Sequence, residues 1–178
     1  MALSKIDVAN FLDGTIPQGN VANASLGAVT ALPAGVGGKV LQVVTGTTTT
    51  RVESSSSTYA DTNLSVTITP SSSSNKIYII GTQAECFKSS SNSANSIHIR
   101  LLRDATEILD IVDRGLLTAS AIENMCNIGF NHLDSPATTS AITYKTQFHN
   151  QGNYSFASVQ QQGAGVSTIT AMEIEAWF

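Results

Sequence analysis

The chain has 178 residues and a mass of 18.7 kDa, which suits one domain with a sizeable core and argues against a multidomain enzyme. Only 12% of the residues are charged, and the net charge is −4, so no basic field exists to hold nucleic acid or an anionic membrane. Serine and threonine supply about 42 residues, which favours strands and turns over helices. Neither a signal peptide nor an apolar run of about 18 residues occurs, so we expect synthesis in the cytoplasm without membrane insertion.

Residues 1–38 differ in pattern from the rest of the chain. Ser4 followed by Asp7 predicts a short capped helix over residues 5–12, and residues 15–38 keep neither a helical nor a strand period. The segment still carries too many apolar side chains for a solvated linker, so we predict an extended attachment arm. It would dock on a neighbouring subunit or a larger assembly; the alternative is that it wraps its own domain. The anchors that we expect for attachment are Ile6, Phe11, Leu12 and Ile16.

From residue 39 onward, apolar and polar residues alternate with a period of 2, as in a β-strand. Residues 64–69 alternate apolar with hydroxyl side chains, and residues 142–149 place Ile142, Tyr144 and Phe148 on one face. Turn residues such as Thr45-Gly46 separate the apolar stretches. Further strands are predicted over 39–45, 77–86, 97–103, 107–112, 121–130, 154–159 and 167–178. The pattern predicts an all-β fold, an antiparallel two-sheet β-sandwich with jelly-roll-like order, as a knob domain over residues 39–178.

One segment admits a second interpretation. Ile108, Ile111, Val112 and Leu116 fall at near-helical spacing, so residues 107–117 could instead form a helix. The strand is the preferred interpretation.

The two cysteines and three histidines of the chain carry no pattern typical of a catalytic or metal-binding site. Cys86 and Cys126 are too few for a disulfide scaffold and lie in apolar stretches, so both are expected to be inert buried thiols. His98 and His149 alternate with apolar residues, which predicts ordinary surface histidines on the polar face of their strands. No histidine pair has zinc-ligand spacing, and no Gly-x-Ser-x-Gly sequence supports a hydrolase.

Four carboxylates, at Asp104, Glu107, Asp110 and Asp113, recur at every third position. On a helix this spacing could suit a hard cation, but on a strand the side chains alternate between faces, and no calcium-loop motif is present. We therefore expect these carboxylates to be solvated, with partners among the arginines at 100, 103 and 114. The glycine-rich stretch at 35–38 is not expected to form a phosphate-binding loop. No catalytic, cofactor-binding or metal-binding residue is predicted.

The predicted strand over residues 167–178 carries the single tryptophan and ends with Trp177-Phe178. Trp177 and Phe178 are expected to be buried, either in the core of the chain or at a subunit interface, and the pattern leaves both possibilities open.

Five segments carry a resemblance to a known family. They are residues 38–44 (GKVLQVV), 64–77 (LSVTITPSSSSNKI), 100–104 (RLLRD), 167–174 (STITAMEI) and, in the arm, 13–20 (DGTIPQGN). The first four resemble small structural proteins of tailed phages, frequently those of cyanobacterial and marine hosts. The last is similar to N-terminal attachment segments of phage fibre-like proteins.

This resemblance implies a non-enzymatic virion surface protein, made in the host cytoplasm, that forms a homotrimer and needs no cofactor. It would bind the major capsid protein or another virion protein, but neither nucleic acid nor a membrane. A capsid decoration (cement) protein is the preferred role, because the chain lacks long shaft repeats. The alternative is a short tail fibre or receptor-binding protein that recognises a host surface glycan through the loops Ser54–Ser57, Ser71–Asn75 and Ser89–Asn95.

A third class, a carbohydrate-active enzyme or lectin, is less favoured. Such proteins usually need paired carboxylates and several aromatic side chains to stack sugars, whereas this chain has one tryptophan and 6% aromatic residues.

Overall fold

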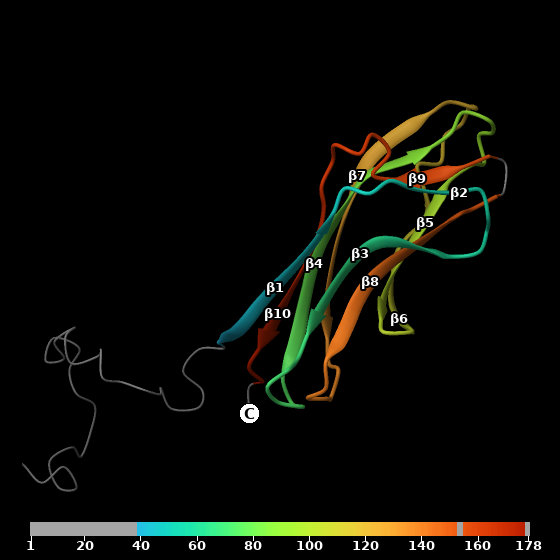
Figure 1. The fold of residues 1–178 in the computed structure, drawn as a ribbon. Coiled ribbons are helices and arrows are strands. Elements are labelled where there is room, and N and C mark those ends of the chain that lie inside the picture. Colours follow the sequence, from blue (N-terminus) through green and yellow to red (C-terminus); the bar gives the residue numbers. More distant parts are fainter. Residues whose placement is uncertain (1–38, 153–154, 177–178) are drawn as a thin grey trace, which may run out of the picture. The chain divides into compact units, whose positions relative to one another are not determined.

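The structure is a computed structural model that describes residues 39–152 and 155–176, which form an antiparallel β-sandwich (Figure 1). Within this part of the chain no helix is long and apolar enough to cross a membrane. The predicted fold class is confirmed. The strands are β1 (Val40–Thr48), β2 (Val52–Ser54), β3 (Ala60–Ile68), β4 (Lys76–Lys88), β5 (Ile97–Arg103), β6 (Thr106–Gly115), β7 (Asn124–Asp134), β8 (Ile142–Asn150), β9 (Ala157–Val159) and β10 (Ser167–Ile174).

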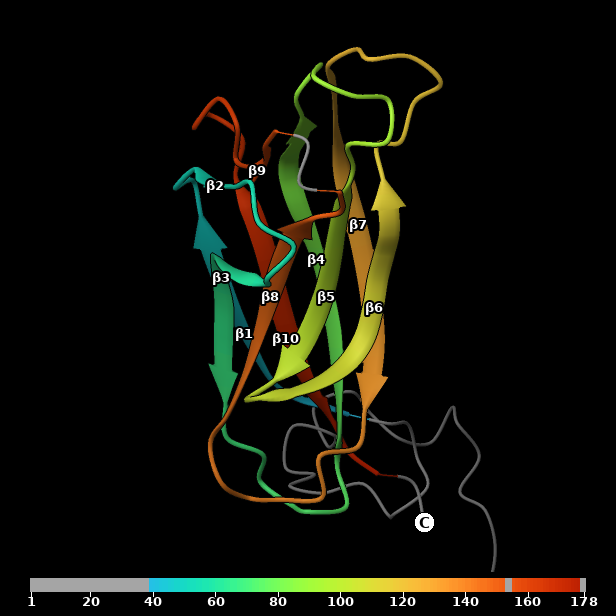
Figure 2. The same cartoon turned by 90° about the vertical axis from the view of Figure 1, so that its right-hand side faces the viewer.

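The strands pair in jelly-roll order. A six-stranded sheet has the order β1-β10-β4-β7, and β9 and β2 continue it beside the C-terminal end of β4. A four-stranded sheet has the order β3-β8-β5-β6 and lies over the first sheet (Figure 2). Each sheet joins strands that are distant in sequence, as in two interlocked Greek keys.

Alternation decides which side chains enter the core. Leu64, Val66 and Ile68 of β3 are buried, while the hydroxyl residues between them face solvent. The prediction for β8 is confirmed in the same way, because Ile142, Tyr144 and Phe148 are all buried.

A polar seam divides the interior into two apolar clusters, one containing Tyr144 and the other Phe148. Between them, Gln83 of β4 donates from Nε2 to Ser167 Oγ at 3.0 Å and accepts from Thr146 Oγ1 at 3.0 Å. Because Gln83 and Thr146 belong to different sheets, these bonds join the two layers and satisfy polar groups that would otherwise be costly to bury.

A second buried contact also joins the sheets. Arg103 Nη1 of β5 lies 2.9 Å from both carboxylate oxygens of Asp134 at the end of β7. The hydroxyl of Tyr144 donates to Asp134 Oδ2 at 2.7 Å. Burial, together with the hydrogen bond to this carboxylate, raises the pKa of Tyr144, so the phenol stays protonated.

The turn predicted at Thr45-Gly46 is wrong, because β1 continues through both residues to Thr48. Gly46 lies where β1 passes close to β3: a Cβ at this position would be 1.8 Å from the carbonyl oxygen of Ser65. The glycine therefore permits two backbones from different sheets to approach, and it does not reverse the chain.

The alternative interpretation of residues 107–117 as a helix is wrong, because this segment forms the strand β6, as the preferred interpretation predicted. Its pairing with β5 contains several register shifts, which mark bulges. Each bulge changes which side chains face the core, so apolar residues follow one another at helix-like intervals. Ile108 and Leu109 contact one apolar cluster and Val112 contacts the other.

Two further differences concern β7 and its neighbour. The strand continues beyond the predicted end at Phe130 to Asp134. Cys86 is buried as predicted, but the prediction is wrong for Cys126, which is exposed on β7, an outer strand paired to β4 alone. The short strand β2 was not predicted, because three residues are too few to display a period.

Candidate functional surfaces

The outer face of the four-stranded sheet carries a cluster of aromatic and charged side chains. His98 of β5 and His149 of β8 are cross-strand neighbours, with ring centroids 4.9 Å apart. Tyr59, directly before β3, meets both rings edge-on, with centroid distances of 5.5 Å to His98 and 4.5 Å to His149. The guanidinium carbon of Arg100 lies 3.5 Å from the centre of the Tyr59 ring, a cation–π contact.

Carboxylates of β6 complete this cluster. His98 Nε2 lies 2.9 Å from Asp110 Oδ1, and its Nδ1 lies 3.5 Å from Asp113 Oδ1. Arg100 Nη1 donates to Glu107 Oε2 at 2.9 Å. Both ring nitrogens of His98 therefore face carboxylates of β6. These contacts join β5 to β6, and the contact between the two histidine rings joins β5 to β8.

The two histidines do lie on the outer face, but the prediction of ordinary surface residues is wrong for His149. Its side chain is 8% exposed, because Tyr59 covers it. Burial lowers the pKa of His149, and the nearby charge of Arg100 acts in the same direction. Sequence patterns could not reveal that Tyr59 packs over His149, since Tyr59 lies between strands in a Ser- and Thr-rich segment.

The four regularly spaced carboxylates are engaged separately. Asp104 Oδ1 accepts a hydrogen bond from the backbone N–H of Thr143 at 2.9 Å, and the other three bind Arg100 or His98. The described part of the chain contains no group of three or more His, Cys, Asp or Glu placed to hold a metal ion. Among the arginines expected as their partners, Arg103 instead binds Asp134.

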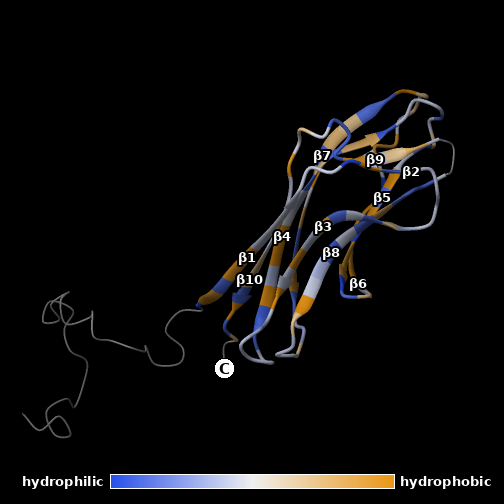
Figure 3. Cartoon of the chain, viewed as in Figure 1, coloured by the Kyte–Doolittle hydropathy of each residue, from blue (hydrophilic) through white to orange (hydrophobic). Residues whose placement is uncertain are grey.

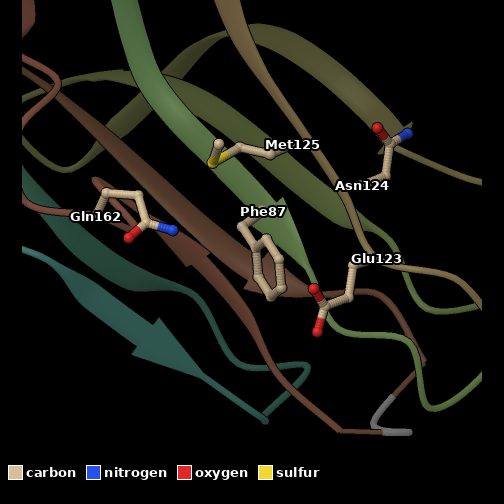
Figure 4. Close-up of a pocket in the computed structure, with 5 residues that line it drawn as sticks. All are labelled: Phe87, Glu123, Asn124, Met125 and Gln162. Carbon is tan, nitrogen blue, oxygen red and sulfur yellow. The ribbon is translucent and has the colours of Figure 1, made fainter.

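A small pocket of about 220 Å³ opens near the C-terminal end of β4 (Figure 4). Its lining combines an aromatic ring, a carboxylate, two amides and a thioether: Phe87, Glu123, Asn124, Gln162 and Met125. The Phe87 ring stacks on that of Phe156, with centroids 5.6 Å apart. Typical ligand pockets are larger, at roughly 300 to 1,000 Å³, so this one suits at most a single sugar ring or a short side chain.

The chain enters and leaves the described sandwich at the opposite end. The backbone N–H of Glu175 donates to the carbonyl of Lys39 at 3.0 Å, so the residues flanking β1 and β10 lie side by side. Ile174 pairs with Lys76 at the start of β4, whereas the pocket residue Phe87 is near its end. The length of β4, 13 residues at about 3.3 Å each, separates the two ends.

A buried carboxylate organises this entry end. Glu173 is 1% exposed and accepts hydrogen bonds from Gln42 Nε2 at 2.6 Å and Asn75 Nδ2 at 2.7 Å. The backbone N–H and hydroxyl of Ser71 each donate to it at 2.7 Å. Burial opposes the charge, but these donors outweigh it and lower the pKa of Glu173 to about 2.

The three serine-rich loops do not gather on one surface. Ser71–Asn75 lies at the entry end and is held by Glu173, while the other two loops lie at the far end, near the pocket. In Ser89–Asn95, the buried Asn95 amide donates to Ser89 Oγ at 3.0 Å and to the Phe156 carbonyl at 3.1 Å. Much of the polarity of these loops is therefore used within the chain.

The expected attachment and interface residues lie outside the described residues, so those assignments stay predictions. They are Ile6, Phe11, Leu12, Ile16, Trp177 and Phe178.

No protein-family model matches this sequence, and no curated protein is significantly similar to it. Among solved structures, the infectious bursal disease virus VP2 subviral particle is 13% identical, with a TM-score of 0.44. The match covers 76% of this chain and 39% of that chain. A structure of the Gx strain of the same virus is 13% identical, with a TM-score of 0.43 and coverage of 77% and 33%. This chain thus spans well under half of either protein, and likeness at this level bears on no function.

Proposed function

We propose that this chain is a non-enzymatic structural protein of a phage virion, with a capsid decoration (cement) role on the head surface. Residues 1–38 would attach to the major capsid protein or another virion protein, and the sandwich would project as a knob. The observation that carries the proposal is the separation of the two ends of the sandwich. The chain enters beside Glu175 at one end, and the pocket opens at the other.

Three further points support this role. The family resemblance of the sequence is to phage structural proteins, and the jelly-roll order found in the sheets is used by viral coat and lectin domains. An apolar arm would gain about 25 cal/mol for each Å² of apolar surface that it buries on the capsid, and several arms bound together would add avidity.

The test is reconstitution on particles that lack the protein, followed by electron microscopy. Full-length protein should add regular density over the whole head. A variant lacking residues 2–36 should keep the circular dichroism spectrum of a folded β-sandwich but add no density. If the truncated protein binds as well as the full chain, the attachment role of the arm is refuted. If it unfolds, the arm belongs to the core of the knob.

The alternative role is a short tail fibre or receptor-binding protein that recognises a host surface glycan. The pocket favours it, because an aromatic ring beside a carboxylate and two amides suits a sugar. Density at the tail alone in the same micrographs would support this role. Loss of host-polysaccharide binding in Glu123→Ala would then assign the pocket. A glycosidase is less favoured, because Glu123 is the single carboxylate among the residues that line it.

A further inference from the structure

The two outer faces of the sandwich differ sharply in polarity. The four-stranded sheet presents charged side chains to solvent, including Asp61, Arg100, Glu107 and Lys145. The six-stranded sheet instead presents a row of apolar residues that crosses four strands in register. The row consists of Val43 of β1, Met172 of β10, Tyr78 of β4 and Leu133 of β7.

Neighbouring rows extend this apolar face. Ile80 follows Tyr78 on the same side of β4, and Leu41 and Ile174 border it on β1 and β10. Val43, Leu133 and Ile80 are 54%, 51% and 44% exposed, so the apolar surface is accessible. Figure 3 shows hydrophobic residues, in orange, along β1 and β4 of this sheet. Single exposed apolar residues are ordinary on protein surfaces, but a contiguous patch across four strands marks an interaction site.

The row that contains Ile80 and the row after it carry neutral polar residues, threonine and asparagine, beside Ile80. Ile80 pairs with Thr170 and Asn131, and Thr82 pairs with Thr168. Lys76, at the edge of the face, is the charged residue nearest to it on β4, and its Nζ donates to Ser135 Oγ at 2.9 Å. A charged partner would find no counter-charge over these rows, whereas a neutral apolar surface would meet no electrostatic cost.

We propose that the apolar face of the six-stranded sheet packs against the same face of a second copy of this chain, about a two-fold axis near Ile80. An isologous contact requires a surface that tolerates itself, and a neutral face does so without like-charge repulsion. Four strands about 4.8 Å apart, each contributing about seven residues, give a face of roughly 400 Å². Two such faces bury roughly 800 Å², below the roughly 1,200 Å² at which standard specific interfaces begin, so the dimer is weak and reversible.

Sedimentation velocity of the full chain over a range of concentrations tests this proposal. The wild type should shift from monomer to dimer as its concentration rises towards roughly 200 μM, since an interface of this size is weak and transient. Ile80→Lys should weaken association at least tenfold, because a lysine near the axis faces its own copy. The matched control is Ser65→Lys, which adds the same charge to the exposed outer face of β3 and should leave association unchanged.

Charge reversal shows whether the face meets itself. Ile80→Glu alone should also weaken association, and an equimolar mixture with Ile80→Lys should restore it as a heterodimer. Circular dichroism of each variant establishes that it is folded before its mass is measured. The proposal is overturned by a wild type that stays monomeric at roughly 200 μM. It is equally overturned by association that survives Ile80→Lys, by loss of association in Ser65→Lys, or by a trimer, which would instead support the homotrimer that the sequence resemblance implies.

Discussion

Replacing Glu173 with glutamine tests how the entry end of the sandwich is held together. The side chain keeps its size, but one of its oxygens becomes an N–H₂ group that faces donors instead of accepting from them. Four hydrogen bonds from Gln42, Ser71 and Asn75 converge on the native carboxylate. At least one of them must be lost, together with the negative charge that strengthens the rest.

The magnitude follows from the pKa of Glu173. Lowering it from 4.5 to about 2 corresponds to about 3 kcal/mol in favour of the charged form. Because the side chain is 1% exposed, solvent screens this contribution little. We therefore expect Glu173→Gln to lower the free energy of unfolding at pH 7 by about 2 to 3 kcal/mol.

The pH dependence provides a second readout. The pKa of Glu173 is lower in the folded state than in the unfolded chain, so its stabilisation is complete above pH 4.5. It is lost as the pH falls through about 2. Urea unfolding, followed by circular dichroism, should show that the difference in free energy of unfolding between wild type and Glu173→Gln is largest at pH 7 and narrows towards pH 2.

The matched control is Glu175→Gln, at an exposed carboxylate two residues further along the chain. It should change the free energy of unfolding by less than about 0.5 kcal/mol. If Glu173→Gln unfolds at the wild-type urea concentration at pH 7, the reasoning from the hydrogen-bond network fails. It fails equally if the gap between the two proteins stays constant down to pH 2.

Two further changes probe the core and the thiols. Tyr144→Phe should lower the free energy of unfolding by about 1 to 2 kcal/mol, since it removes one hydrogen-bond donor to Asp134. Arg103→Met should lower it by more, about 3 to 5 kcal/mol, because it leaves the Asp134 carboxylate buried without its cation. Urea unfolding measures both, and equal losses would contradict this ranking. A thiol reagent should modify Cys126 in the folded protein and Cys86 only after unfolding, which peptide mass spectrometry can check.

The sequence could predict those features that depend on local alternation. The period of 2 in residues 64–69 and 142–149 identified β3 and β8, together with the side chains that they bury. It could not predict that β1 runs through Gly46, because the reason is the carbonyl of Ser65 in the other sheet. The bulges of β6 interrupt the alternation on which the prediction depends, so a helix stayed open there as the alternative to the preferred strand.

The candidate surfaces were less predictable than the strands. His98 and His149 are distant in sequence and become neighbours through the register of β5 with β8, and Tyr59 covers them from a segment with no strand pattern. The apolar face likewise depends on register across four strands. Only the alignment of β1, β10, β4 and β7 places four residues that are distant in sequence in one row: Val43, Met172, Tyr78 and Leu133.

The distribution of charge links these surfaces to the proposed role. A chain with only 12% charged residues has few with which to keep both faces of a sandwich soluble. Asp61, Arg100, Glu107 and Lys145 pair on the outer face of the four-stranded sheet. On the six-stranded sheet the row from Val43 to Leu133 carries no charge, and Lys76 lies at its edge. The same sandwich separates its entry end from its pocket along the strands. Under the two proposals, one face would pack on a second copy, the other face would meet solvent, and the entry end would lead to the attachment arm, an arrangement that suits a protein built into a larger particle.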